Sequence, residues 1–266
     1  MQAKIKSYAK LNLALNITGK TSSLHKIESI VAFNSLHDEI FIKKIKSKSH
    51  NIMFTGRFSK NINRKNTVSK LLEILEKKEL LKNLKFKIKI NKQIPNKAGL
   101  GGGSMNAASI LKYFVIKKII KISKKELLKI SKLIGSDVIL GLNSKNSILN
   151  SKNEIIHLNN TKKFYTLIVK PSFGCSTKEI FSKIRKFDKP KLNYPSKRMF
   201  EIRFLKKMNN SLEPIVFAKY TKLKKIKLFL ESLSKPIFVR MTGSGSALVA
   251  YFLSKQRCNN AKKIFS

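Results

Sequence analysis

Hydrophobic and polar residues alternate along several segments of the chain, and this period of two is typical of strands with one buried face. Other segments repeat their hydrophobic residues every three or four positions, as amphipathic helices do. The strand pattern covers residues 5–17, 27–33, 38–45, 51–54, 84–92, 164–170, 237–240 and 247–252, the first long enough for a pair of strands. The helical pattern covers residues 67–81, 104–116, 198–209, 220–233 and a basic segment from about 256. Strands and helices alternate without a repeat period, which predicts an α+β fold.

Two further helix starts are marked by single residues. Ser123 and Ser176 are each followed three positions later by a glutamate, and this spacing is that of a capping box. Gly135 is placed to end the first of these two helices. The second helix carries Phe181.

The length of 266 residues and the 42% of hydrophobic residues predict two domains. The polar, turn-rich residues 143–153 suggest a boundary, with one domain over residues 1–155 and another over 156–266. No apolar run reaches the length of a membrane span, and the first ten residues lack a signal-peptide pattern. We therefore expect a cytoplasmic protein that does not enter a membrane. Cys175 and Cys258 lack metal-ligand spacing, which argues against a zinc site or a disulfide scaffold.

The charge is extreme, with 57 Lys and Arg against 14 Asp and Glu, a net +43. A basic surface can bind nucleic acid by releasing counterions from the phosphate backbone. However, 50 of the basic residues are lysines, scattered from end to end, whereas arginine is favoured for bidentate phosphate and base recognition. A compositional bias of the source genome explains this pattern better. We expect no nucleic-acid partner, although the field attracts anionic substrates such as nucleotides.

The segment most informative about function is residues 95–108, Pro-Asn-Lys-Ala-Gly-Leu-Gly-Gly-Gly-Ser-Met-Asn-Ala-Ala. Four glycines within five residues follow a strand pattern and lead into a helical one. Glycine lets backbone N–H groups crowd around a ligand, and the helix that follows directs its positive dipole end toward the same point. The segment therefore predicts a phosphate-binding loop.

Three well-known glycine-rich loops do not fit. The P-loop of ATPases ends in Gly-Lys-Ser/Thr, whereas this loop continues Gly103-Ser104-Met105. The dinucleotide-binding loop requires glycine where Ser104 stands and an acid about 20 residues further on, and residues 107–125 contain no acid. The His-Arg-Asp of the protein-kinase catalytic loop is missing. A loop that only turns the chain is a poor explanation of so long a string.

The string resembles the phosphate-binding motif of the GHMP kinases, the superfamily of galactokinase, homoserine kinase, mevalonate kinase and phosphomevalonate kinase. The resemblance implies two domains, an N-terminal nucleotide-binding α+β domain and a C-terminal ferredoxin-like domain, with the active site in the cleft between them. It implies ATP, with its phosphates on residues 99–104, and Mg²⁺ bridging those phosphates. The implied nucleotide-binding residues are Asn66, Lys92, Pro95, Asn96, Lys97, Ala98, Gly99, Leu100, Gly101, Gly102, Gly103, Ser104, Met105 and Asn106.

The resemblance also implies a catalytic pair. Alone, Asp137 in Ile134-Gly-Ser-Asp-Val reads as a turn or N-cap residue, and Lys10 is one of 50 lysines. In the GHMP kinases an aspartate in Gly-Ser/Ala-Asp-Val is the catalytic base. Lys10 in Ala9-Lys-Leu-Asn-Leu13 is expected to face Asp137 and the acceptor hydroxyl, where a cation stabilises the developing alkoxide.

The same Ala-Lys-Leu-Asn-Leu string is similar to one branch of the superfamily, which phosphorylates the 2-hydroxyl of a cytidine diphosphate-linked methylerythritol in non-mevalonate isoprenoid synthesis. A histidine that contacts cytosine and an aromatic residue that stacks on it match His25 and Phe181. The order of further matches agrees, with Asn-Ser-Leu-Glu-Pro at residues 210–214 and a third glycine motif at residues 240–247. The implied substrate-binding residues are Asn12, His25, Phe181, Thr242 and Gly243.

The chain departs from this branch at four positions. Leu24 replaces a tyrosine that forms one side of the cytosine site, which predicts weaker base binding unless Tyr8 or Phe33 compensates. Ser22 and Ser23 replace an Asp-Gly turn, and Ile139 replaces a proline after Asp-Val.

Two other functions remain open at this point. One is a GHMP kinase for another small alcohol, of the homoserine or phosphomevalonate type, which Leu24 favours. The other is a basic nucleic-acid-binding protein on a relic kinase fold, against which the scattered lysines argue. We expect a small-molecule kinase that is a monomer or a weak dimer.

Overall fold

The computed structural model describes residues 2–22, 24–233 and 235–265. The chain folds into two compact units, each assembled from separate segments. Unit 1 comprises Met1–Lys10, Phe33–Asn96 and Gly101–Ser144, and unit 2 comprises Leu11–Ala32, Lys97–Leu100 and Lys145–Ser266. Both units contain helices and strands, as the α+β prediction requires. Because the units are discontinuous, the boundary after residue 155 stays a prediction.

The strands are β1 (Ala3–Lys20), β2 (His25–Ile45), β3 (Asn51–Thr55), β4 (Lys85–Asn91), β5 (Ser147–Leu149), β6 (Ile155–His157), β7 (Tyr165–Val169), β8 (Phe238–Met241) and β9 (Leu248–Phe252). The helices are α1 (Thr67–Lys77), α2 (Gly102–Ile116), α3 (Lys124–Ile134), α4 (Val138–Gly141), α5 (Thr177–Ser182), α6 (Ile202–Lys207), α7 (Glu213–Lys219), α8 (Thr221–Ser232) and α9 (Lys255–Phe265), with a 3₁₀ turn η1 (Lys197–Phe200). Within the described residues, no helix has the length and apolar run needed to cross a bilayer.

The two N-terminal strands are longer than the hydrophobic pattern predicts. β1 is one strand rather than a pair, and β2 is continuous where two strands were expected. The physical reason is that β2 changes partner along its length: residues 29–31 pair with β5 in unit 2, and residues 39–45 pair with β4 in unit 1. Its polar middle interrupts the apolar alternation without interrupting the extended backbone.

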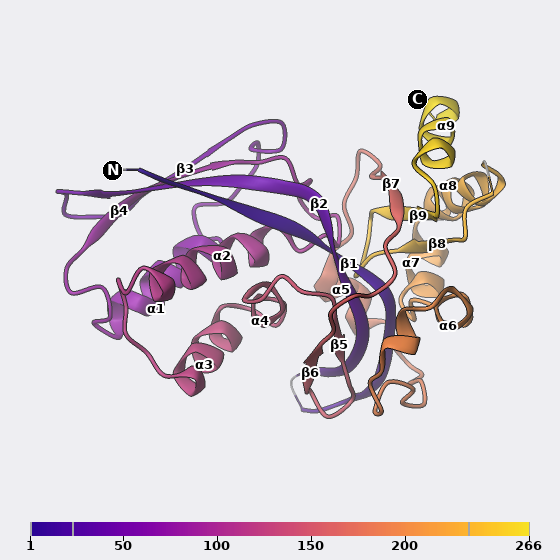
Figure 1. Ribbon diagram of the computed structural model, residues 1–266, viewed down its shortest axis with the longest axis horizontal. Helices are drawn as coiled ribbons and strands as arrows, with labels where there is room; N and C mark the ends of the chain where they lie inside the picture. Colours follow the sequence, from indigo (N-terminus) through magenta and orange to yellow (C-terminus); the bar gives the residue numbers. More distant parts are fainter. Residues whose placement is uncertain (1, 23, 234, 266) are drawn as a thin grey trace. The chain divides into compact units, whose positions relative to one another are not determined.

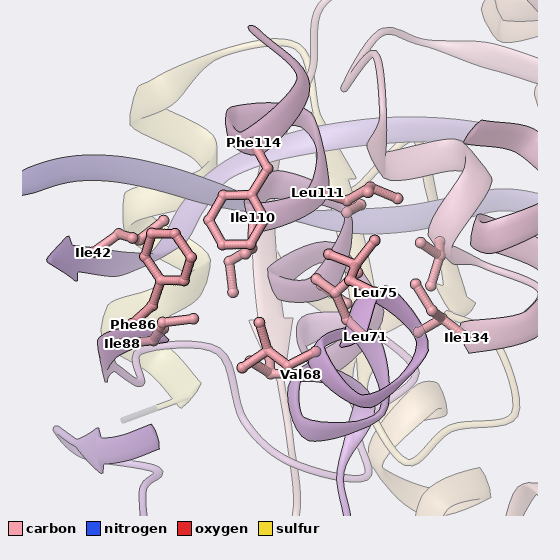
Figure 2. Close-up of a cluster of buried hydrophobic side chains, with 14 of the residues drawn as sticks. Ile42, Val68, Leu71, Leu75, Phe86, Ile88, Ile110, Leu111, Phe114 and Ile134 are labelled. Carbon is pink, nitrogen blue, oxygen red and sulfur yellow. The ribbon is translucent and has the colours of Figure 1, made fainter. Parts of the chain in front are cut away.

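In unit 1, helices cover one face of a sheet. β4 pairs in parallel with β3 and antiparallel with β2, and α1, α2 and α3 lie on the same side of these strands (Figure 1). In β4 the side chains of Phe86, Ile88 and Ile90 are buried and alternate with lysines that are more exposed. Figure 2 shows Phe86 and Ile88 packed beneath α2, beside the apolar face of α1. This core holds α2, the helix that begins at the glycine-rich loop.

In unit 2, β9 lies between β7 and β8 in an antiparallel sheet, and all five of its residues are buried. Helices α8 and α9 pack against this sheet. The Arg240 guanidinium is buried and donates to the main-chain oxygens of Leu13, Leu205 and Met208. Arg240 therefore joins β8 to β1 and to the end of α6.

Helix starts were predicted better than helix extents. Ser123 and Ser176 are the N-cap residues of α3 and α5, and Gly135 follows α3. The single helix predicted over residues 198–209 is wrong, because Glu201 has an extended backbone (φ −76°, ψ 149°) that separates η1 from α6. The pattern also missed α4 and α7, which are too short to show a helical period.

The core of unit 1 gives a stability prediction. Leu71 on α1 is fully buried, and replacing it with alanine leaves a cavity, so we expect Leu71→Ala to lower the free energy of unfolding by about 2–5 kcal/mol. Leu133 on α3 is half exposed, and Leu133→Ala is the matched control with a change of about 0.5 kcal/mol or less. Chemical denaturation followed by circular dichroism measures both, and equal losses would contradict the packing described.

Candidate active site

The two predicted catalytic residues form an ion pair in unit 1. The Lys10 Nζ lies 3.2 Å from the Asp137 Oδ2. The Lys10 side chain is almost fully buried, whereas that of Asp137 is 38% exposed. The carboxylate is thus open to a substrate on one side and held by an ammonium on the other. This is the arrangement needed to accept a proton from a hydroxyl and to stabilise the oxyanion that forms.

The fold brings this pair together from residues 127 positions apart in the chain. Lys10 lies on β1, and Asp137 is the N-cap residue of α4, reached by a short turn after α3. The Val138 N–H donates to the Gly135 oxygen at 3.1 Å, which closes this turn. Although Ile139 stands where a proline was expected, Asp137 still meets Lys10.

The glycine-rich loop ends at the start of α2, as predicted. Gly101 is the N-cap residue and has the left-handed conformation (φ 70°) that glycine adopts without strain. It has no side chain to accept hydrogen bonds from the first amides of the helix, and residues 102–105 include no acid. The positive end of the α2 dipole is therefore available to an anion.

Close packing explains why the loop needs glycine rather than small residues in general. A Cβ atom on Gly101 would lie 2.8 Å from the Lys10 Cγ, so the stem of this lysine passes directly beside the loop. A Cβ on Gly103 would lie 3.0 Å from the Thr67 Oγ1, which donates to the Gly103 oxygen at 2.7 Å. Ser104 lies on the α3–α4 side, with its Oγ 3.9 Å from the Cβ position of Gly135.

The buried carboxylate of Asp38 contacts the residues on both sides of the glycine-rich loop. The Asp38 side chain is fully buried, and its Oδ1 accepts from the N–H groups of Gln93 (2.7 Å) and Ile94 (2.8 Å). Its Oδ2 accepts from the Asn106 Nδ2 at 3.0 Å and forms an ion pair with Lys92. One side chain thereby connects the end of β4, the chain entering the loop, and the second turn of α2.

Three predicted nucleotide-binding residues have other partners within the protein. The Lys92 side chain is 2% exposed, and its burial lowers its pKa more than the attraction of Asp38 raises it. Asn106 is buried with it. Asn66 caps α1, accepting from the amides of Val68 and Ser69. These contacts give each of the three residues a structural role. A direct contact with a nucleotide stays a prediction for each of them.

The remaining loop residues differ in exposure. Ala98, Leu100 and Met105 are buried, so their backbones rather than their side chains are the groups available to a ligand. Lys97 is exposed. Pro95 and Asn96 are half-buried, and the Asn96 Nδ2 donates to the Phe58 oxygen at 2.8 Å.

In unit 2, the first residues of the loop lie against the third glycine motif. The buried Thr242 Oγ1 donates to the Gly99 oxygen at 3.2 Å and accepts from the Asn12 N–H at 3.0 Å. The Cα of Gly99 is 3.1 Å from the position of a Cβ on Gly243. Asn12, Thr242 and Gly243, all predicted to bind substrate, therefore gather around Gly99.

The two residues predicted to contact a base also meet in unit 2. The rings of His25 and Phe181 are edge to face with centroids 5.3 Å apart. Burial, followed by the charge of Lys20, lowers the pKa of His25, so its imidazole is neutral at neutral pH. Leu24 is 68% exposed. Ser22 is exposed, and Ser23 lies outside the described residues.

Comparison with known proteins identifies the family. The chain is 55% identical to the 4-diphosphocytidyl-2-C-methyl-D-erythritol kinase of Pelagibacter ubique, over 97% of this chain and 92% of that protein. The chain belongs to the 4-diphosphocytidyl-2-C-methyl-D-erythritol kinase family. The enzyme of the same name from Buchnera aphidicola is 33% identical over 98% of this chain and 87% of its own length. Residues 66–149 of this family member match the model of the GHMP kinases N terminal domain.

Solved structures agree in fold. A crystal structure of 4-(cytidine 5'-diphospho)-2C-methyl-D-erythritol kinase superposes with a TM-score of 0.78 at 22% identity, covering 98% of this chain and 94% of that one. Homoserine kinase from Cytophaga hutchinsonii superposes with a TM-score of 0.63 at 18% identity, covering 98% and 90%. The predicted GHMP kinase fold and the prediction of a small-molecule kinase are confirmed.

Sequence reasoning about this GHMP kinase missed Asp38 and the Thr177–Ser244 contact. Asp38 is one of only 14 acids and is the first residue of the alternating pattern over residues 38–45, which is the one signal that singles it out. The Thr177 and Ser244 hydroxyls lie 2.8 Å apart and link α5, the helix of Phe181, to the third glycine motif. Nothing in the sequence points to that pair. Among the residues that the structure describes, no three His, Cys, Asp or Glu side chains gather as metal ligands would.

The Asp38 network of this kinase gives a second stability prediction. Asp38→Asn leaves the buried Lys92 ammonium without its countercharge, so we expect the free energy of unfolding to fall by about 3–5 kcal/mol. Glu39→Gln is the matched control at the next position, where the partner is the exposed Lys4, and we expect a much smaller loss. Denaturation of both variants under identical conditions checks this, and a tolerant Asp38→Asn would show that the pair does not hold the loop.

Proposed function

We propose that this kinase transfers the γ-phosphoryl group of ATP to the 2-hydroxyl of 4-diphosphocytidyl-2-C-methyl-D-erythritol, releasing ADP. The 55% identity to the Pelagibacter ubique enzyme over nearly the whole chain supports this substrate. The observation that carries the chemistry is the ion pair of Lys10 and Asp137 beside the start of α2 in unit 1.

Phosphoryl transfer requires few chemical groups from the protein, because most of the catalysis is positioning and charge stabilisation. Asp137, with its exposed carboxylate, accepts the proton of the acceptor hydroxyl as the oxygen attacks the γ-phosphorus. Lys10 stabilises the negative charge on that oxygen. The bond to the β-phosphate oxygen breaks, and ADP leaves.

The N-terminus of α2 suits the triphosphate. The amides of residues 102–104 begin a helix whose N-cap is glycine and whose first turn contains no acidic residue. Ser104 adds a hydroxyl on the side of Gly135. Magnesium bound with the nucleotide would neutralise phosphate charge, and Ser104 is the loop residue able to ligate it. Asn66, Lys92 and residues 95–106 belong to the proposed nucleotide site.

The base of the acceptor is assigned to unit 2. The neutral His25 imidazole has one nitrogen that donates and one that accepts, and the Phe181 ring supplies an apolar surface. Asn12, Thr242 and Gly243 line the region around Gly99, where the proposal places the rest of the acceptor.

Turnover of ATP with candidate acceptors tests the substrate. We expect Mg²⁺-dependent ADP release with 4-diphosphocytidyl-2-C-methyl-D-erythritol and none above background with homoserine or phosphomevalonate. A preference for either of those alcohols would be compatible with the proposed role of the phosphate-binding loop and would overturn the proposed acceptor. Inactivity with all three would also overturn the proposed acceptor.

The catalytic pair is tested separately. Asp137→Asn keeps the shape of the side chain but removes the proton acceptor, so we expect kcat to fall at least about a hundredfold while the KM for ATP changes little. Lys10→Met should lower kcat in the same way. Glu73→Gln, on an exposed position of α1, is the control and should retain wild-type kcat. Full activity of Asp137→Asn would exclude it as the base.

A further inference from the structure

A third aromatic ring lies beside the proposed base site. The Phe187 ring centroid is 6.5 Å from that of His25, so the His25 ring neighbours both Phe187 and Phe181. Phe187 is 49% exposed, so about half of its side chain is open to a ligand. It follows α5 by five residues, in a segment from which the sequence predicted no site residue.

The backbone around Phe187 is held in place. The Asp188 N–H donates to the Ile17 oxygen at 2.8 Å, and the Asp188 Oδ2 accepts from the Ile17 N–H at 3.3 Å and from the Ser211 hydroxyl. Three residues further on, the buried Glu28 carboxylate accepts from the N–H groups of Lys191 and Leu192. Phe187 thus projects from a segment anchored to both strands that lead to and from the β1–β2 turn.

Charge around this segment suits a phosphorylated ligand. Residues 176–191 contain six basic residues against Glu179 and Asp188. Glu179 already pairs with Lys219, and Asp188 accepts the hydrogen bonds described above. An exposed ring in a segment with excess positive charge fits an aromatic base that carries a diphosphate.

This inference rests on the proposed function. We propose that Phe187 is a specificity-determining residue whose ring contacts the pyrimidine of the cytidine diphosphate group and replaces the aromatic surface that is lost at Leu24. Leu24 offers no π-face, and its side chain extends into solvent from a turn closed by Thr21. Of the two sequence-based candidates for this replacement, Tyr8 and Phe33, the Tyr8 ring packs on His37. The ring that accompanies His25 and Phe181 in unit 2 is Phe187.

The test compares three substitutions at one site. Stacking on a base depends on an aromatic face, so Phe187→Tyr should keep the KM for the cytidyl substrate within about threefold of wild type. Phe187→Leu and Phe187→Ala should raise that KM about tenfold or more, with kcat and the KM for ATP nearly unchanged. Phe229→Ala is the matched control, because Phe229 is 46% exposed and packs on Phe265 of α9. It should leave all three constants unchanged.

Binding of cytidine 5'-diphosphate, measured by calorimetry, gives a readout that does not depend on turnover. We expect Phe187→Leu to raise the Kd for cytidine 5'-diphosphate by the same factor by which it raises the KM for the cytidyl substrate. Wild-type affinity in Phe187→Leu would overturn the role of Phe187 and leave the proposed kinase intact. No binding to the wild-type protein, together with no turnover of the cytidyl substrate, would instead reject the proposed acceptor and this inference with it.

Discussion

The glycine-rich loop depends on a single buried ion pair. Burying an ammonium and a carboxylate costs free energy that their mutual attraction offsets only when the remaining hydrogen-bonding capacity is also used. Asp38 meets this condition, since its two oxygens accept from Gln93, Ile94 and Asn106 besides Lys92. The Asp38 carboxylate is therefore held by four partners, which together fix its position.

The Asp38 network positions the proposed catalytic groups indirectly. Asn106 lies on α2, so fixing Asn106 also fixes the first turn of the helix, where Gly101 is packed against the stem of Lys10. Lys10 in turn meets Asp137. A chain of contacts within unit 1 thus leads from a residue with no access to solvent to the carboxylate that is open to it. Positioning of this kind is what phosphoryl transfer requires most from a protein.

The sequence predicted the parts of the site that consist of consecutive residues. Residues 95–108 carry their chemistry as a string, and Asp137 and Lys10 each stand in a short motif, so local sequence is enough to locate the loop and the pair. Asp38 and Phe187 act through partners 50 or more and 162 positions away, in segments without a motif. The continuity of β2 was missed for a similar reason, because its hydrogen bonds come from two different partners. Local patterns do not report such long-range pairing.

Arg240 shows where this lysine-rich chain requires an arginine. Its planar guanidinium donates to the oxygen of Leu13 on β1 and to those of Leu205 and Met208 at the end of α6. A lysine would bring the same charge as a single point on a flexible stem, and it could not reach all three oxygens in this arrangement. The buried position 240 therefore requires the shape of the arginine side chain, and its positive charge alone would not be enough.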